Sequence, residues 1–117
     1  MGKKNREYTV EERISKEKKR LLKIFDGIGA KKLALLNADI ENLAFYTVMC
    51  EDIRKKIIET GTAIKYQNGA NQFGQKLSPD AETVDKWSLR IDQIIGRLLT
   101  MVPEEQQPSR LAELMKR

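Results

Sequence analysis

The sequence predicts a mainly all-α protein: a helical hairpin of two long helices joined by a short extended or β-hairpin segment, with a further helix at the N-terminus. Apolar residues recur at intervals of three and four over three stretches. Helix-start signals precede two of these stretches. Residues 61–77, between the second and third, change to β-branched, aromatic and turn-forming residues. We divide the chain into a basic N-terminal tail and helix (1–32), a helical oligomerisation core (33–103), and a C-terminal tail with a short helix (104–117).

The first predicted helix begins after Thr9. The hydroxyl of Thr9 can accept a hydrogen bond from the backbone of Glu12, and the Glu12 carboxylate can reach back to Thr9, which is the capping-box pattern. Apolar residues continue at helical spacing as far as Ile28. Gly27 and Gly29 then predict a turn, because two glycines so close together favour a break in the helix.

The second predicted helix covers residues 30–60, with a kink or a new N-cap at residues 37–39. Its central run, residues 43–50, could by itself be a buried strand, but its flanks keep a helical period. A helix that is apolar on every side must be covered on every side. We therefore expect a subunit interface here, the alternative being that the helix is wrapped by its own chain. The residues expected at the oligomer interface are Phe45, Val48, Met49 and Trp87.

Gly61 suits the position just after a helix end, and a hairpin is expected to follow it. The dipeptide of Asn68 and Gly69 is a strong signal for a two-residue turn. That turn would place Ile64 opposite Phe73 as an apolar cross-strand pair. A longer loop is the alternative.

The third long helix is expected to begin at Ser78, as N-cap, with Pro79 at its first position. Its apolar residues, including Trp87, fall within an arc of about 140°. Pro103 should stop this helix. A polar linker and a short helix over 109–117 would follow.

The positive charge is concentrated at the N-terminus. The chain has 22 Lys and Arg against 17 Asp and Glu, a net charge of +5, and residues 1–32 contribute 11 bases and 5 acids, or +6. A basic segment on a neutral body indicates contact with a polyanion; the alternative is a solvated helix face. Ammonium and guanidinium groups at i, i+3, i+4 and i+7 form the best stripe, namely Lys16, Lys19, Arg20 and Lys23. The full set of expected DNA contacts is Lys3, Lys4, Arg6, Arg13, Lys16, Lys19, Arg20 and Lys23.

Catalytic and metal-binding chemistry has few candidates in this composition. The chain has no histidine, which removes most zinc sites and every Ser-His-Asp or Cys-His pair. Cys50, the single cysteine, lies in an apolar run and is expected to be a buried, inert thiol. We therefore expect no enzyme activity, no metal and no cofactor. We also expect no membrane partner, because no apolar stretch is long enough to span a bilayer, and a cytoplasmic location.

One segment resembles a known family. Residues 61–74 read Gly-Thr-Ala-Ile-Lys-Tyr-Gln-Asn-Gly-Ala-Asn-Gln-Phe-Gly, and Lys76 to Pro79 read Lys-Leu-Ser-Pro. This string is similar to a signature of phage terminase small subunits of the P27-like type. The likeness covers about residues 9–103, including the helix that ends before Pro103. The N-terminal region matches the family only in its general basic character.

The resemblance implies a non-catalytic component of phage DNA packaging in the cytoplasm of the bacterial host. Its partners would be double-stranded DNA, the terminase large subunit, which carries the ATPase and nuclease, and further copies of itself in a ring. A repeated heterologous interface that closes would give such a ring. One alternative is a small prophage-encoded helical transcriptional regulator that binds DNA as a dimer. Another is a structural adaptor whose charge is incidental.

Overall fold

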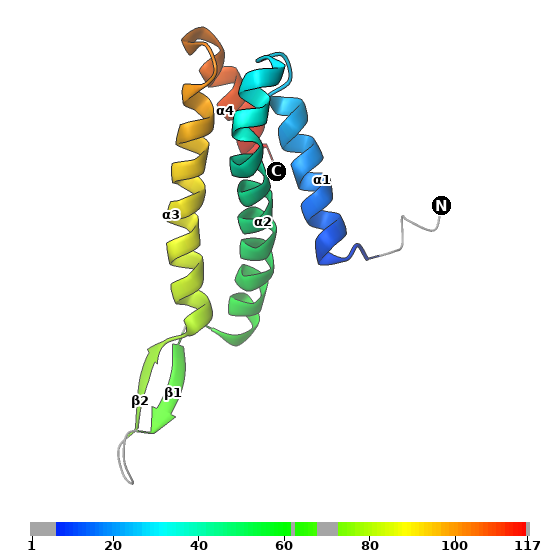
Figure 1. Cartoon of the computed structure of the whole chain (residues 1–117). Helices are drawn as coiled ribbons and strands as arrows, with labels where there is room; N and C mark the ends of the chain where they lie inside the picture. The colour runs from blue at the N-terminus through cyan, green and yellow to red at the C-terminus, as the bar shows by residue number, and fades with distance from the viewer. Residues whose placement is uncertain (1–6, 62, 68–72, 117) are drawn as a thin grey trace.

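The structure is a computed structural model of the chain that describes residues 7–61, 63–67 and 73–116, and it is mostly helical (Figure 1). Two short strands lie between the second and third helices, and a 3₁₀ turn over Glu104–Gln106 precedes the last helix. The elements in chain order are α1 (Val10–Ile24), α2 (Ala30–Thr60), β1 (Ala63–Gln67), β2 (Phe73–Leu77), α3 (Pro79–Thr100) and α4 (Gln107–Met115).

The predicted helix starts are confirmed. The backbone N–H of Glu12 donates to Thr9 Oγ1 at 3.1 Å, and the N–H of Thr9 donates to Glu12 Oε1 at 3.1 Å, which completes the capping box. Ser78 Oγ accepts from the N–H of Ala81 at 3.1 Å, and Pro79 occupies the first turn of α3. These bonds satisfy backbone donors that a helix leaves free at its N-terminus.

The second helix runs without interruption from Ala30 to Thr60, so residues 43–50 are helical as predicted. The new N-cap expected at residues 37–39 is not formed. Instead, the Asp39 carboxylate binds the Arg97 guanidinium of α3, with Nη2 3.0 Å from Oδ1. A side chain engaged by a neighbouring helix is no longer available to cap its own backbone.

Three of the described helices form one layer, and the fourth covers one face of it. Figure 1 shows α2 in the middle, with α1 and α3 on either side and α4 crossing behind them. The smallest dimension of the molecule is 21 Å, which is about two helix diameters. The buried core between these helices consists of Leu21, Phe25, Leu36, Ile40, Leu43, Ala44, Ile94, Leu98, Val102 and Leu114.

The strands β1 and β2 are antiparallel, but the predicted register is wrong. Ile64 pairs with Lys76, and Phe73 pairs with Gln67, so the expected pair of Ile64 and Phe73 is absent. The ladder leaves residues 68–72 between the strands, and the turn expected at Asn68 therefore lies outside the described residues.

The C-terminal helix begins earlier than expected. It starts at Gln107 rather than at residue 109, and Pro108 lies in its first turn, where a missing N–H does no harm. The side chain of Gln107 donates to the carbonyl oxygen of Val102 at 3.1 Å. This bond satisfies a free carbonyl in the turn that follows α3 and fixes the direction in which α4 leaves it.

Candidate nucleic-acid interface and assembly face

The predicted basic stripe on α1 is only partly present as a free surface. Lys16, Lys19 and Lys23 are exposed and share one side of the helix at i, i+3 and i+7. Lys16 Nζ lies 4.1 Å from the centroid of the Tyr8 ring, a cation–π contact that leaves the ammonium at the surface. We call these three lysines the lysine row. The remaining tail residues of the prediction, Lys3, Lys4 and Arg6, lie outside the described residues.

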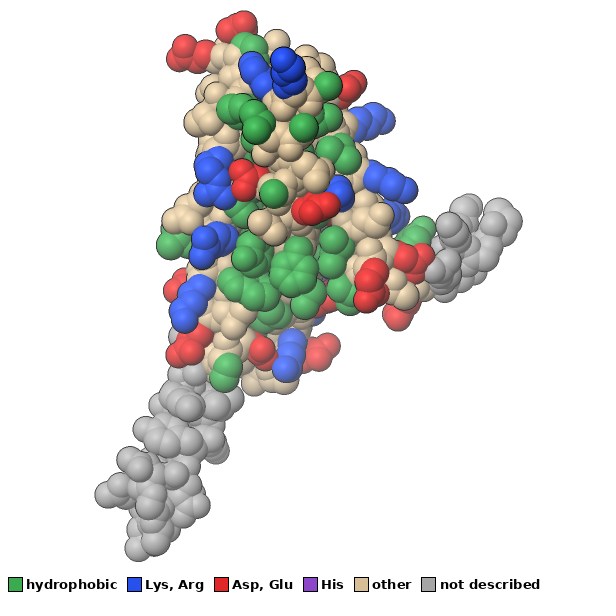
Figure 2. Space-filling view, viewed as in Figure 1, with side chains coloured by type: hydrophobic (Ala, Val, Ile, Leu, Met, Phe, Trp, Pro, Cys, Tyr) green, Lys and Arg blue, Asp and Glu red, His purple; other side chains and the backbone are tan. Residues whose placement is uncertain are grey.

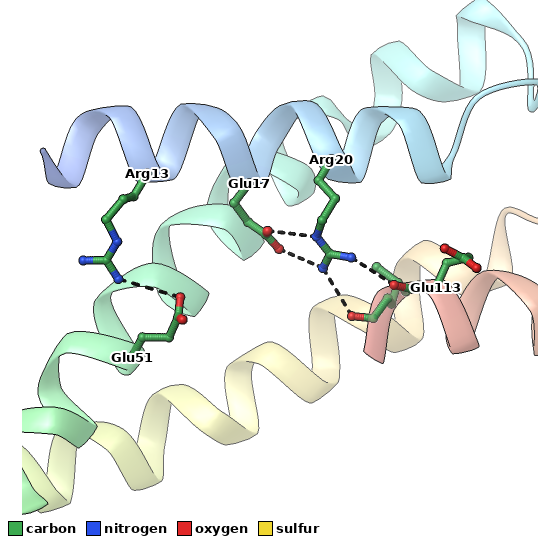
Figure 3. Close-up of polar contacts among 6 residues, drawn as sticks. Arg13, Glu17, Arg20, Glu51 and Glu113 are labelled. Atoms are coloured by element: carbon green, nitrogen blue, oxygen red, sulfur yellow. Dashed lines mark hydrogen bonds and ion pairs between the residues drawn. The ribbon is translucent and has the colours of Figure 1, made fainter. Parts of the chain in front are cut away.

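Arg20 does not belong to this row, because its guanidinium turns toward α4 (Figure 3). Its Nε and Nη2 donate to the two oxygens of Glu17 at 2.9 and 3.0 Å, and Glu17 is only 5% exposed. Its Nη1 donates to the carbonyl oxygen of Glu113 at 2.9 Å, and Nη2 also reaches that of Leu114 at 3.3 Å. Arg20 thus acts as a C-terminal cap for α4.

A second arginine makes the reverse contact. Arg110 of α4 donates through Nη1 to the carbonyl oxygen of Ile24, the last residue of α1, and through Nη2 to Gln106 Oε1 at 3.0 Å. Each arginine therefore satisfies carbonyl groups at the C-terminal end of the other helix. We call this reciprocal pair the arginine clasp.

Arg13 is also engaged within the chain. Its Nη1 lies 2.6 Å from Asp52 Oδ1. Its Nη2 lies 3.8 Å from Glu51 Oε1, the pair drawn in Figure 3. Both ion pairs link α1 to α2. Of the residues expected to contact DNA, Arg13 and Arg20 are therefore both engaged in contacts within the chain. On α1, the expected contacts that remain exposed are those of the lysine row.

Three aromatic rings meet on the surface of α2 and α3. The ring centroids of Phe45 and Tyr46 are 5.6 Å apart, those of Phe45 and Trp87 are 5.9 Å apart, and those of Tyr46 and Trp87 are 5.1 Å apart. Phe45 is still 40% exposed. Tilted contacts of this kind hold the rings in place and leave apolar surface in contact with water.

The aromatic rings belong to a larger apolar face. Leu35, which is 73% exposed, begins a series at intervals of three and four that stays on one side of α2. Figure 2 shows apolar side chains gathered over the middle of the molecule on the side opposite α4. We call this surface the bare face; its residues are Leu35, Ala38, Asn42, Phe45, Met49, Ile53 and Trp87.

The residues expected at an oligomer interface are divided between this face and the core. Phe45 is exposed, and Met49 and Trp87 are half-buried on the bare face. Val48 is 1% exposed and is therefore covered within the single chain. Part of the apolar surface of residues 43–50 is thus wrapped by its own chain, and part faces solvent.

Two ion pairs cross between helices beside the bare face. Lys18 Nζ lies 2.6 Å from Glu41 Oε1, between α1 and α2, and Arg97 Nη2 lies 3.0 Å from Asp39 Oδ1, between α3 and α2. The hydrogen bond and charge of Lys18 lower the pKa of Glu41. The hydrogen bond and charge of Asp39 raise the pKa of Arg97.

We expect the pair of Lys18 and Glu41 to make a small contribution to stability that depends on pH. Because the pKa of Glu41 is lowered in the folded chain, this contribution is complete above the ordinary glutamate value of about 4.3 and is lost as pH falls through the lowered pKa. The difference in free energy of unfolding between the wild type and Lys18→Gln, measured by urea denaturation, should therefore vanish in acid. A difference that persists at about pH 2 would contradict this assignment.

The described part of the chain offers few residues for covalent chemistry or metal binding. Cys50 is buried, and burial raises the pKa of its thiol more than nearby Arg54 lowers it, so the thiolate that could react is disfavoured. No group of three or more potential metal-ligating side chains is found among the residues described. None of the helices described is long and apolar enough to cross a membrane.

The arginine clasp is the main feature that sequence analysis missed. The spacing of Glu17 and Arg20 at i, i+3 is a signal for an ion pair, and it could have indicated that Arg20 was engaged. The contact of Arg20 with the end of α4 had no such signal, because Glu113 lies 93 residues further along the chain.

Comparison with known proteins adds no relative. No family model matches the chain, and neither a curated protein nor a solved structure matches it.

Proposed function

We propose that this chain is a non-catalytic DNA-binding component of phage DNA packaging, comparable in role to a terminase small subunit. It would bind double-stranded DNA as a homo-oligomer, with a ring as the expected form, and would regulate the terminase large subunit in the cytoplasm of the bacterial host. The observation that carries this proposal is the presence of two distinct surfaces on one small chain. The lysine row on α1 suits a polyanion, and the bare face suits a protein partner.

The lysine row supports the DNA part of the proposal. Lys16, Lys19 and Lys23 are exposed at i, i+3 and i+7, a spacing that lets their ammonium groups meet successive phosphates along a backbone. Lysines on phosphates position a protein on DNA but read little sequence. We therefore expect binding through this surface to be strongly dependent on salt and weakly dependent on sequence.

The bare face supports the oligomeric part of the proposal. A surface with three clustered aromatic rings and a 73% exposed leucine is typical of protein–protein contact. Oligomerisation matters for DNA binding because one chain offers only a few phosphate contacts. Several copies in one particle raise the effective concentration of lysine rows beside the same DNA.

A dimeric DNA-binding transcriptional regulator is the second candidate. The same two surfaces would serve it, since a pair of chains also presents two lysine rows. The mass of the particle in solution separates the two functions, because a closed ring contains many more chains than a dimer.

The DNA surface is tested by replacing Lys16, Lys19 and Lys23 with alanine and leaving Arg20 intact. Removing one lysine–phosphate interaction should reduce the slope of log affinity against log salt by about 0.9, so removing three corresponds to a change of about 2.7 per chain. Affinity should fall for all DNA sequences alike. Titrating labelled duplexes at several salt concentrations, with fluorescence anisotropy as the readout, measures both quantities.

The matched control removes three exposed bases of α2 that lie outside the bare face, by replacing Lys32, Arg54 and Lys55 with alanine. This variant has the same net charge as the test variant. Equal losses of affinity in the two variants would mean that net charge alone governs binding. An unchanged salt slope in the lysine-row variant would place the DNA surface elsewhere.

A further inference from the structure

We propose that the bare face binds the bare face of a second copy of this chain about a two-fold axis parallel to α2, so that the two α2 helices run in the same direction. This inference rests on the self-association in the proposed function and specifies its geometry. The pair would be closed and isologous. A closed pair does not extend into a ring through this face, so a ring would require a further contact between pairs.

The spacing along α2 suits a helix-to-helix seam. Positions 35, 38, 42, 45 and 49 alternate intervals of three and four, which is the repeat that keeps one side of a helix against a partner helix. The polar member of this series is Asn42, which is exposed. A single asparagine in such a seam can bond to its own counterpart when the helices are parallel and in register, and it thereby specifies that arrangement.

The charges beside the bare face have opposite signs on its two sides. The ion pair of Lys18 with Glu41 identifies the side of α1 that lies beside the bare face. Glu11 is exposed on that same side, seven residues earlier, and makes this flank acidic near the start of α1. Arg97 marks the side of α3 that meets Asp39, and exposed Arg90 is again seven residues earlier. Figure 2 shows acidic side chains near the start of α1 and basic side chains along α3, with the apolar surface between them.

These flanks also lie at a similar height along α2. Arg13, two residues after Glu11, binds Asp52 on α2. Arg54, two residues after Asp52, donates to Ser88 of α3 at 3.2 Å. Ser88 lies between the exposed bases Lys86 and Arg90, so the acidic and basic flanks are level with each other across the bare face.

This charge pattern selects one of the two possible two-fold axes. An axis parallel to α2 places α1 of one copy opposite α3 of its partner, so that Glu11 faces Lys86 and Arg90. An axis perpendicular to α2 makes the helices antiparallel and places α3 opposite α3, so that the basic side chains of Lys86, Arg90 and Arg97 from the two copies meet on one side of the interface. Like charges across an interface oppose association, and the parallel arrangement is therefore favoured.

Charge reversal tests this selection. With Glu11→Lys or Arg90→Glu alone, dissociation of the pair, measured by analytical ultracentrifugation at low salt, should become roughly three- to tenfold easier, because two symmetry-related ion pairs become repulsive. The double variant should regain wild-type association, since the charges are exchanged. Tighter association of Arg90→Glu would indicate the antiparallel arrangement, in which the two basic α3 flanks face each other, and single reversals without effect would exclude this face. Either result would overturn the proposal.

Cysteine cross-linking tests the direction of the helices independently. Residues 38 and 56 are exposed and lie five full turns apart on one side of α2. In a parallel pair, Ala38→Cys alone should form a disulfide-linked dimer in oxidised glutathione, and Lys56→Cys alone should do the same. In an antiparallel pair, the cross-link would form only when the two variants are mixed. Ser109→Cys, exposed on α4, serves as the control that should remain monomeric under denaturing conditions.

These tests separate the pairing from the proposed function. Wild-type chain that stays monomeric at high concentration would overturn the self-association itself, and the pairing with it. Wild-type chain that self-associates but gives neither single-variant cross-link would overturn only the parallel pairing. DNA binding by the lysine row is measured separately and can survive both results.

Discussion

Replacing Phe45 by glutamate is expected to leave the chain folded and to abolish association through the bare face, which lowers the mass of the particle, whereas the same change at Val48 should unfold it. Phe45 is 40% exposed, so a carboxylate there can stay hydrated in the single chain but would be buried without a partner at an interface. Val48 is 1% exposed. An unpaired charge buried at that position costs several kcal/mol, which is comparable with the whole stability of a small domain, about 5–15 kcal/mol.

Circular dichroism and sedimentation velocity together distinguish these outcomes. Leu89→Glu is the matched control, because Leu89 is 61% exposed on α3 but lies outside the bare face. That variant should keep both its helical signal and the mass of the wild-type particle. If Phe45→Glu also kept the full oligomeric mass, the bare face could not be the assembly surface.

Replacing Arg20 by methionine should lower the free energy of unfolding by about 2 kcal/mol, because a nearly buried carboxylate loses its bidentate partner. Glu17 is 5% exposed, and its two oxygens accept hydrogen bonds from Arg20 at 2.9 and 3.0 Å. The carbonyl groups of Glu113 and Leu114 lose donors as well. The loss in free energy of unfolding should be smaller than for a fully buried ion pair, because the Arg20 side chain is 29% exposed and solvent screens its charge. Urea denaturation measures the change.

The control for this variant is Lys23→Met, which removes one charge from an exposed position on the same helix. It should leave stability nearly unchanged and weaken DNA binding. Arg20→Lys should recover little of the stability that Arg20→Met removes, because an ammonium group cannot reproduce the planar fork of a guanidinium. If Arg20→Met kept the stability of the wild type and lost affinity for DNA, the main role of Arg20 would be contact with DNA and not stabilisation of α4.

Local sequence signals predicted most of the helical framework. The capping box at Thr9, the N-cap at Ser78 and the proline at the first position of α3 act through bonds within three residues, and all three are present. The helical period on both sides of residues 43–50 was also sufficient to identify α2. Such features depend on neighbours in the chain and can be read without knowledge of the packing.

Features that depend on distant contacts could not be predicted in the same way. The helical spacing of Lys16 and Arg20 gave no indication that one would be exposed and the other turned toward α4, since that difference depends on a helix that follows more than eighty residues later. Similarly, Val48 is buried whereas Phe45, three residues earlier on the same helix, is exposed, and this difference depends on how the neighbouring helices pack. The register of the hairpin was mistaken because the strongest turn signal does not fix where pairing resumes.

The arginine clasp has a consequence for the order of folding. Its hydrogen bonds join residues that are 86 to 94 positions apart, so it closes a loop that includes nearly all of the described chain. Closing a long loop loses more chain entropy than pairing adjacent helices does. The contacts of α2 with α1 and α3 should therefore form before α4 docks. In native-state hydrogen exchange, the amides of α4 should open at lower free energy than those in the middle of α2, and this terminal helix would be the first part of the fold to detach.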